Sequence, residues 1–256
     1  MSLSGELCLG TVDVIVDRLG LAEVPGVETP ERMVLTSPMV PDGSVGSMRL
    51  WRKDGVADLI YVGLSVPMIG LDSHMMFAFT PPTSPVPHFT LDSVAGGAPP
   101  GADPEATPSY AFHLDLIPKV DLGAHLGYLR HCFEPLTPIH ESITDDEGFS
   151  KAHLSPTQYA VMSAWMLVHR ATEDAFRGVG ERVAGYRDHW FSLVENGVPD
   201  DLLDGLTEAD LAERDRRNRA IVFDPTVDPV WERVTQLVGE EQSEAVRSTL
   251  AAPIPV

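Results

Sequence analysis

Short hydrophobic runs separated by turn residues dominate the chain between residues 32 and 118. They are rich in β-branched, aromatic and other apolar side chains, and they lie at residues 33–36, 47–51, 57–66, 73–79, 88–94 and 110–117. Pro41-Asp42-Gly43 and Asp54-Gly55 separate neighbouring runs, as tight turns do. Because no helix-length pattern interrupts the runs, the sequence predicts a meander of antiparallel strands. Residues 96–107, rich in Gly, Pro and Ala, are expected to form a loop.

Helical patterns flank this region on both sides. Apolar positions over residues 6–21 predict an N-terminal helix. After residue 118, helices are expected at residues 121–133, 158–169, 173–194 and 208–219, and Asp228-Pro229 opens a last helical stretch. Ser155 to Gln158 form a capping box with proline at the first helical position. Residues 158–169 are apolar nearly all round, which predicts a buried central helix.

Strands followed by helices favour an α+β protein, in which helices pack on the faces of one antiparallel sheet. A hydrophobic fraction of 43% over 256 residues is enough for one sizeable core. No internal repeat or linker stands out. Residues 1–256 are therefore predicted to form a single domain, strand-rich over 30–118 and helical over 119–256.

The chain is strongly acidic, with 18 basic against 38 acidic residues and a net charge of -20. Nucleic acid and anionic membrane would be repelled at long range, so neither is an expected partner. The two cysteines, Cys8 and Cys132, make no disulfide framework or zinc motif, and a reducing, cytoplasmic setting is expected. The N-terminus has no signal-peptide pattern, and no apolar stretch is long enough to span a bilayer.

The sequence contains no recognised cofactor or metal motif. Gly178, Gly180 and Gly185 follow an expected helix rather than a strand, and so make no dinucleotide fingerprint. His113 and Asp115 share one face of an expected strand, but no third ligand has a telling spacing, and no metal is expected. Without a flavin, nicotinamide or haem motif, no bound cofactor is expected. Any redox chemistry must then take electrons from an external donor.

Two regions resemble the ferredoxin-dependent bilin reductases and red chlorophyll catabolite reductases. In the first, PHFTLDSVAGG (residues 87–97) precedes YAFHLDLIPKVDLGAHLGYL (residues 110–129), which contains a Leu-Asp-x-x-Pro element. The second, SPTQYAVMSAWMLVHRA (residues 155–171), is similar to the long central helix of the chlorophyll catabolite branch, and RDRRNRAIVFD (residues 214–224) has a comparable look. The resemblance implies a three-layer α/β/α sandwich with a central antiparallel sheet. It also implies an open-chain tetrapyrrole between sheet and C-terminal helices, no bound cofactor, and ferredoxin as electron source.

The same resemblance implies catalytic residues. Asp92 occupies the place of the strand acid that donates a proton to the pigment, and Asp224 lies near the acid that faces it from the C-terminal side. His74 matches the histidine used by one branch, and Asp115 matches the acid of the Leu-Asp-x-x-Pro element. The chemistry needs such groups, because an added electron makes a conjugated system basic and a positioned acid must protonate one carbon. A carboxyl group in an apolar pocket has a raised pKa and stays protonated near neutrality.

Four further side chains are candidates for binding the substrate: His88, His113, Asp115 and Trp165. His88 shares a strand face with Asp92 by the alternation of side chains along a strand. Structural alternatives stay open for all of these positions. Asp92 can cap a turn or pair with an arginine, Asp224 can be a turn acid, the histidines can be satisfied strand residues, and Trp165 can belong to the core.

The leading hypothesis is an oxidoreductase acting on CH–CH bonds, which reduces a linear tetrapyrrole or another pyrrole-like conjugated small molecule. Ferredoxins are acidic, so docking needs a basic surface, and the densest basic cluster is Arg214, Arg216, Arg217 and Arg219. Two alternatives stay open: a non-redox acid/base enzyme of specialised metabolism, such as an isomerase or cyclase, and a non-catalytic small-molecule-binding protein. Residue usage favours a bacterial source, and the oligomeric state stays open.

Overall fold

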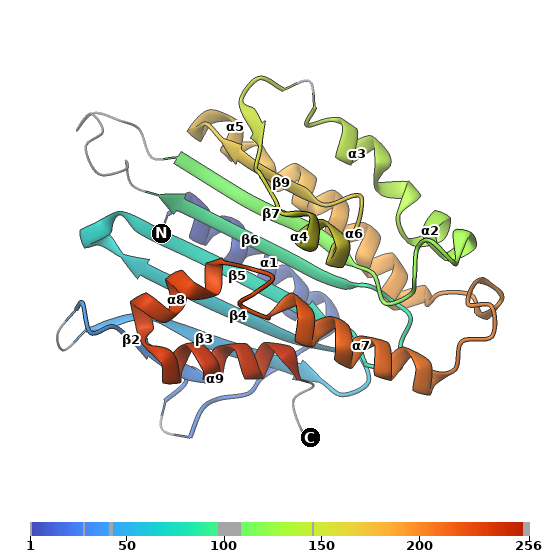
Figure 1. Cartoon of the computed structure of the whole chain (residues 1–256), viewed down its shortest axis with the longest axis horizontal. Coiled ribbons are helices and arrows are strands. Elements are labelled where there is room, and N and C mark those ends of the chain that lie inside the picture. The colour runs from blue at the N-terminus through green and yellow to red at the C-terminus, as the bar shows by residue number, and fades with distance from the viewer. Residues whose placement is uncertain (1, 28, 41–42, 97–108, 145, 253–256) are drawn as a thin grey trace.

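A large antiparallel sheet forms the centre of the molecule (Figure 1). The computed structural model describes residues 2–27, 29–40, 43–96, 109–144 and 146–252. Within these residues the strand order is β1-β3-β4-β5-β6-β7-β9-β8, with β2 also paired to β3. The strands are β1 Ala22–Glu23, β2 Met33–Thr36, β3 Ser44–Lys53, β4 Ala57–Val66, β5 Leu71–Phe79, β6 His88–Gly96, β7 Ser109–Ile117, β8 Phe149–Lys151 and β9 Leu167–Ala171.

Strands β3 to β7 form the predicted meander, in which each strand pairs with the next one along the chain. The expected runs at 33–36 and 57–66 coincide with β2 and β4, and β3, β5, β6 and β7 extend by a few residues beyond the expected runs. Strands β1, β8 and β9 were not expected. In β6, Asp92 lies opposite Met75 of β5 and His113 of β7. Directly opposed residues of antiparallel strands point to the same side of a sheet. These three side chains therefore share one face.

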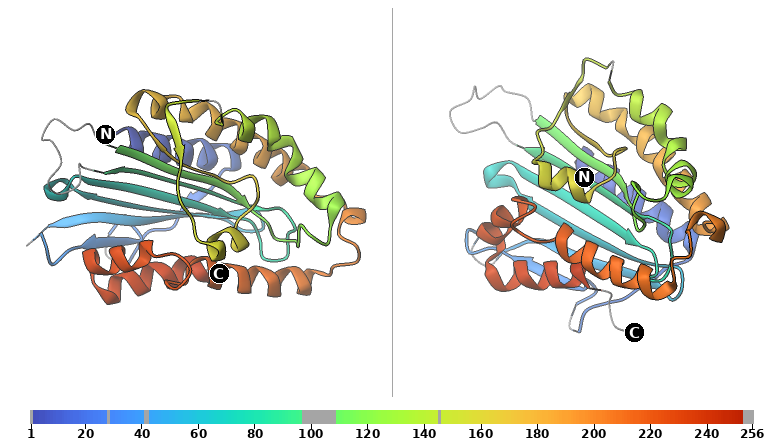
Figure 2. Two further views of the ribbon diagram at one scale, coloured as in Figure 1. Left: turned by 45° about the horizontal axis from the view of Figure 1, so that its top comes forward. Right: turned by 45° about the vertical axis from the view of Figure 1, so that its right-hand side comes forward.

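Helices cover both faces of the sheet, so that the expected α+β sandwich is confirmed (Figure 2). On one face, α1 (Leu3–Leu19) lies against β5 and β6, and α6 (Val179–Asn196) lies against β6 and β7. The other face is covered by α7 (Glu208–Val222), α8 (Val230–Val238) and α9 (Glu240–Ala251). The shorter helices are α2 Leu126–Cys132, α3 Thr137–Glu141, α4 Pro156–Val161, α5 Glu173–Arg177 and the 3₁₀ turns Pro67–Ile69, Glu134–Leu136 and Asp200–Leu202.

Capping residues set the starts of several helices. The Ser155 side chain accepts from the backbone N–H of Gln158, and the Gln158 side chain accepts from the backbone N–H of Ser155, so the predicted capping box opens α4. Thr207 and Asp210 make the corresponding box at the start of α7. Each box satisfies two N–H groups that the first helical turn leaves unpaired.

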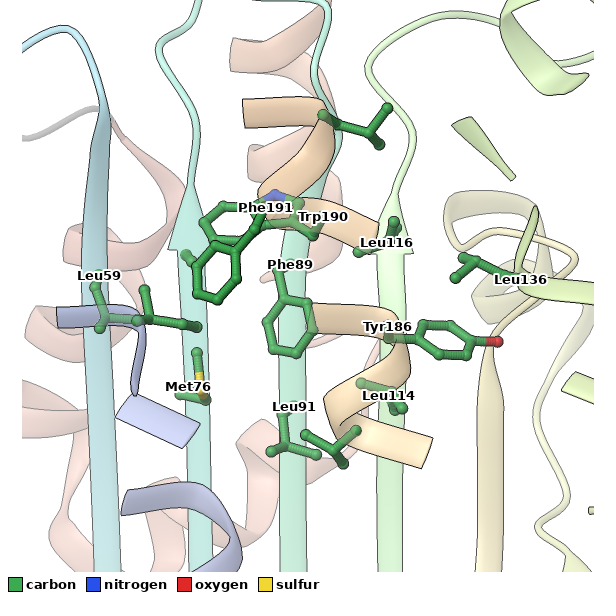
Figure 3. Close-up of a cluster of buried hydrophobic side chains, with 14 of the residues drawn as sticks. Leu59, Met76, Phe89, Leu91, Leu114, Leu116, Leu136, Tyr186, Trp190 and Phe191 are labelled. Carbon is green, nitrogen blue, oxygen red and sulfur yellow. The ribbon is translucent and has the colours of Figure 1, made fainter. Parts of the chain in front are cut away.

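Alternating strand residues build two separate apolar cores, one on each face of the sheet. The core beneath α1 and α6 contains Phe89, Leu91, Leu114, Leu116, Tyr186 and Trp190, as Figure 3 shows. The core beneath α7, α8 and α9 contains Met75, Phe77, Phe79, Ile117, Phe223 and Trp231 among its members. Burial of these faces is the main favourable term that holds helices to sheet. Asp92 and its neighbours at 75 and 113 lie on the second face.

The expected buried helix at 158–169 is wrong, and so is its likeness to a long central helix. α4 ends at Val161, Ser163 lies in a turn, and residues 167–171 form strand β9 between β7 and β8. Of the apolar side chains in this run only Met166 and Leu167 are buried, and Tyr159 is exposed, so composition alone predicted neither the burial nor the type of element. The half expected to be helical thus contributes two strands. The loop expected at 96–107 falls almost wholly on 97–108, outside the described residues. No helix in the described ranges is long and apolar enough to cross a membrane.

Candidate functional site

A cavity of about 130 Å³ lies between strands β5 to β7 and the segment that joins α7 to α8. Its polar side chains come from Ser73, Asp92, His113 and Asp228, and its walls are otherwise apolar. The apolar walls are Met75, Phe77, Val94, Met162, Val222, Phe223, Val230 and Trp231. A concave apolar site with a few convergent polar groups is the usual form of a small-molecule site. We call it the Asp92 cavity.

Asp92 and His113 form a cross-strand pair at the Asp92 cavity. The Nδ1 of His113 lies 3.4 Å from the Oδ2 of Asp92, and the side chains are 15% and 33% exposed. Burial acts to lower the pKa of His113, but the hydrogen bond and charge of Asp92, with the charges of Asp115 and Asp228, outweigh it and raise that pKa. His113 therefore holds its proton to a higher pH than an ordinary histidine, and its Nδ1–H donates to Asp92.

Asp228 brings a second carboxyl group to the cavity from the C-terminal side. Burial raises its pKa above the ordinary value, and the charge of Asp92 adds to the effect, while the backbone N–H of Val230 and the charge of His113 oppose it. A carboxyl group with a raised pKa stays protonated further toward neutrality and can act as a general acid. Asp228 was missed because Asp228-Pro229 is also a helix-start signal. Its position shortly after the 214–224 segment, where an acidic residue was expected, is the sequence signal that could have identified it.

Asp224 and His74 do not lie at this cavity. The Asp224 carboxylate accepts from the backbone N–H of Thr226 at 2.8 Å and from its hydroxyl at 2.6 Å, so it is the turn acid of the structural alternative. His74 lies on the opposite face of the sheet, where its Nδ1 lies 2.6 Å from the hydroxyl of Tyr61 and its Nε2 lies 3.0 Å from Asp72. The physical reason is the two-residue period of a strand, because position 74 and position 75 point to opposite faces.

Asp115 shares the face of Asp92 but supports the cavity from behind. It is fully buried and accepts from the backbone N–H of Ser163 at 2.9 Å and from its hydroxyl at 2.5 Å. Burial raises the pKa of Asp115 to about 6, against the opposing effects of His113 and Ser163. This clamp holds the turn that brings Met162 to the cavity wall. Asp115 is therefore a positioning residue for the wall rather than a group that lines the cavity.

Trp165 is half-buried and packs against the core beneath α1 and α6, and it does not line the Asp92 cavity. Its Nε1 donates to the hydroxyl of Thr137 at 2.9 Å, its backbone oxygen accepts from Tyr186, and its ring packs on Phe133. The tryptophan at the Asp92 cavity is Trp231, which is 2% exposed and lies edge-on to Phe223. Sequence patterns gave no means to choose between these two tryptophans, since both follow expected helix starts.

His88 also lies on the Asp92 face, but its partners are structural. Its Nδ1 accepts from the backbone N–H of Thr80 at 3.1 Å, so its Nε2 carries the proton and donates to Asp215 of α7 at 2.6 Å. Lys119 completes the cluster, with its Nζ 3.1 Å from the same Asp215 oxygen. Burial and the charge of Lys119 lower the pKa of His88 to about 4, against the pull of Asp215. The neutral imidazole and the Lys119–Asp215 ion pair thus fasten α7 to the sheet.

This cluster predicts acid sensitivity of folding. Between pH 6.5 and about pH 4 the unfolded chain binds a proton at His88 and the folded chain does not, so stability present above pH 6.5 falls as the pH falls. We expect His88 to contribute a loss of up to about 3 kcal/mol over this window. Urea unfolding at pH 7 and pH 4.5 measures it. His88→Gln should flatten the pH dependence, and equal slopes in both proteins would contradict the assignment.

Within the described ranges, no group of three His, Cys, Asp or Glu side chains is arranged to hold a metal ion. Searches of protein-family models and of curated proteins found no match to this sequence. A search of solved structures found a crystal structure of phytochromobilin synthase from tomato in complex with biliverdin. The likeness has a TM-score of 0.66 at 13% sequence identity, and covers 94% of this chain and 80% of the tomato chain.

This likeness defines the fold. The chain has the α/β/α arrangement expected from its resemblance to bilin reductases, with a central antiparallel sheet between two helical layers. At 13% identity the comparison establishes architecture and not chemistry. The function must therefore be argued from the Asp92 cavity.

Proposed function

We propose that this protein is a bilin-reductase-like oxidoreductase, which reduces a conjugated, pyrrole-like small molecule with electrons from an external donor. One observation supports this most directly. Asp92 and His113 from the sheet and Asp228 from the α7–α8 segment converge on one cavity. They do so in a fold shared with an enzyme crystallised with biliverdin.

The reaction that suits these groups is a proton-coupled reduction of a carbon–carbon double bond. Each C=C bond that becomes CH–CH takes up two electrons and two protons. The electrons come singly from a reduced one-electron carrier of the ferredoxin class, which is oxidised. The protons come from side chains at the cavity, which are recharged from water. Electron uptake raises the basicity of the conjugated system, so the position of the acid selects the carbon that is protonated.

The three groups can divide the work. The pKa values of Asp228 and His113 are both raised, so each group holds its proton to a higher pH than an ordinary aspartate or histidine. Asp92 accepts from His113 Nδ1–H and so stabilises the imidazolium. After His113 or Asp228 gives up its proton, the negative charge of the nearby Asp92 favours reprotonation of that donor. The apolar walls limit access of water to the reduced intermediate.

For the electron donor we propose only its class, a reduced one-electron carrier such as a ferredoxin. Two arginines of the expected basic cluster, Arg216 and Arg217, share the carboxylate of Glu213, which offsets one of their two positive charges. Arg219 is buried and donates to the backbone oxygens of Leu250 and Ala252. A docking surface for an acidic ferredoxin is thus less basic than the sequence alone suggested.

Anaerobic turnover with a ferredoxin-reducing system tests the proposal. The panel contains a linear tetrapyrrole, a two-ring dipyrrinone and a one-ring pyrrolinone, and product formation is followed by absorbance and mass. A mass gain of two hydrogens that requires the reduced carrier supports reduction. Turnover without a reductant would instead favour the non-redox acid/base alternative. Binding without any turnover would favour a non-catalytic binding protein.

The pH dependence of turnover is expected to report His113. Because the His113 pKa is raised above 6.5 and the protonated ring is the donor, the rate should fall as the pH rises through that raised pKa. In His113→Gln the alkaline limb should move to lower pH, toward the titration of Asp228. His125→Gln, at the start of α2 and outside the cavity, serves as the control. An unchanged pH profile in His113→Gln would remove His113 from the proton path.

A further inference from the structure

The Asp92 cavity is small for the ligand named with the tomato structure. Its volume is about 130 Å³. An apolar cavity of about 150 Å³ holds one benzene molecule, and sites for larger ligands have about 300–1,000 Å³. The space beside Asp92 and His113 therefore matches one five- or six-membered ring. An open-chain tetrapyrrole has four such rings.

Toward the Phe77 end of the strands, the cavity cannot lengthen without displacing packed aromatic side chains. Phe223 and Trp231 are 4% and 2% exposed, and their rings meet edge-on at 6.2 Å. Phe223 also lies edge-on to Phe77, with ring centroids 5.0 Å apart. Beyond them the same face is filled by the core beneath α8 and α9. Protein interiors are close-packed, so opening a larger cavity among these side chains would cost stability.

The polar atoms of the site indicate which hydrogen-bonding groups the bound ring of the ligand carries on the edge that faces Asp92 and His113. Within the described residues, Asp92 Oδ1 and His113 Nε2 are buried and have no hydrogen-bond partner. Because the His113 Nδ1–H donates to Asp92, the Nε2 of the protonated ring is a second donor. A buried polar atom without a partner is costly and calls for one. The pair is thus complementary to a ligand edge with one N–H donor and one C=O acceptor, as in a cyclic conjugated amide.

We propose that the substrate is a compact pyrrolinone of one or two rings, with one ring held in the Asp92 cavity and any second ring at its mouth. The inference rests on the proposed function and narrows its substrate. The N–H of the ring donates to Asp92, its carbonyl accepts from His113 Nε2–H, and Phe77, Phe223 and Trp231 bound its size. Those three aromatic walls close one end of the cavity to a four-ring chain.

Binding measurements with a matched series test the size limit. Wild-type protein is titrated with 3-pyrrolin-2-one, a dipyrrinone and biliverdin, using ligand absorbance and tryptophan fluorescence. The dipyrrinone is expected to bind at least tenfold more tightly than biliverdin. Met162→Trp, which fills the cavity from its half-buried wall, should weaken dipyrrinone binding at least tenfold.

Enlarging the cavity is expected to reverse the preference. Phe223→Ala should improve biliverdin binding at least tenfold relative to the dipyrrinone. Phe191→Ala makes the same truncation in the core of the opposite face and should leave both affinities unchanged. Because Phe223→Ala removes a buried ring, Met162→Ala provides a milder enlargement, and both variants are checked by circular dichroism.

The outcomes separate this inference from the function on which it rests. Tighter binding and reduction of biliverdin by wild type would overturn the size limit and leave the proposed function standing. Absence of binding for all three compounds would overturn both. Reduction of the dipyrrinone, with biliverdin bound only after enlargement, supports both.

Discussion

Asp92→Asn is expected to lower the rate of reduction by about 10²- to 10³-fold, while ligand affinity changes much less. Asparagine has nearly the shape of aspartate, but it cannot accept a proton or stabilise the His113 imidazolium across the 3.4 Å contact. The lost effect is thus on proton delivery rather than on cavity shape. Single-turnover rates after rapid mixing with a reduced carrier, together with the dissociation constant from absorbance titration, measure the two effects separately.

Asp224→Asn is the matched control for this experiment. The same change is made four residues before Asp228, at a carboxylate that binds Thr226 and lies outside the cavity. Asparagine can accept the same backbone N–H, so rate and affinity should stay at wild-type values. In Asp228→Asn, by contrast, the rate of reduction should fall as it does in Asp92→Asn. A large effect at Asp224 with none at Asp228 would contradict the assignment of the second acid.

Asp215→Ala is expected to destabilise the protein by about 3–5 kcal/mol. The side chains of Asp215 and Lys119 are 0% and 1% exposed, and Asp215 is also the acceptor for His88 Nε2–H. Removal of the carboxylate leaves the Lys119 charge buried with only the backbone oxygens of Pro81 and Pro82 as acceptors. Urea unfolding at pH 7, monitored by circular dichroism, gives the free energy change.

The double variant Lys119→Met/Asp215→Leu separates charge burial from packing. With both members of the pair replaced, the Lys119 charge is no longer left without its partner, and apolar side chains of similar volume fill the space. His88 Nε2–H loses its acceptor in the single and the double variant alike. We expect the double variant to lose less than half of the stability that Asp215→Ala loses. If the double variant is as unstable as the single one, the ion pair does not account for the effect. Glu213→Ala, two residues before Asp215 on α7 and exposed, should change stability little.

Local patterns predicted β2 to β7 and the starts of α5 and α7. The runs at 33–36 and 57–66 became β2 and β4 because alternating or continuous apolar residues between turn signals have few other ways to be buried. The capping boxes at Ser155 and Thr207 opened helices because they act within a single turn. These signals depend on neighbours in the chain, and so they can be read without the fold.

Residues 158–169 show where such reasoning stopped. Tyr159, Val161 and Trp165 fit a buried helix by composition, yet the segment divides into α4, a turn and β9. The division depends on Asp115, which accepts two hydrogen bonds from Ser163, forty-eight residues away. It depends also on the open edge of β7, which β9 completes. Neither partner is visible in a local window of sequence.

The site shows the same boundary. The alternation of side chains along each strand shows which residues share a face with Asp92 or with His113. That these two lie opposite each other could be known only from the register of β6 on β7. Asp228 rather than Asp224 reaches the cavity because α7 ends at Val222 and the chain then turns through Asp224 and Thr226 before α8 begins. Four residues along such a turn decide which carboxylate is buried. His74 points to the opposite face because it lies one residue from Met75, which shares the face of Asp92.

The sequence by itself determined the alternation of strands, the order of sheet then helices, the acidic character and the presence of a strand carboxylate at position 92, since these are properties of local composition and period. Only the tertiary structure decided that His113 and Asp228 join Asp92, that His74 faces away, and that the shared cavity has room for one ring. The reason is physical: strand register and aromatic packing between sheet and helices are set by contacts among residues distant in the chain.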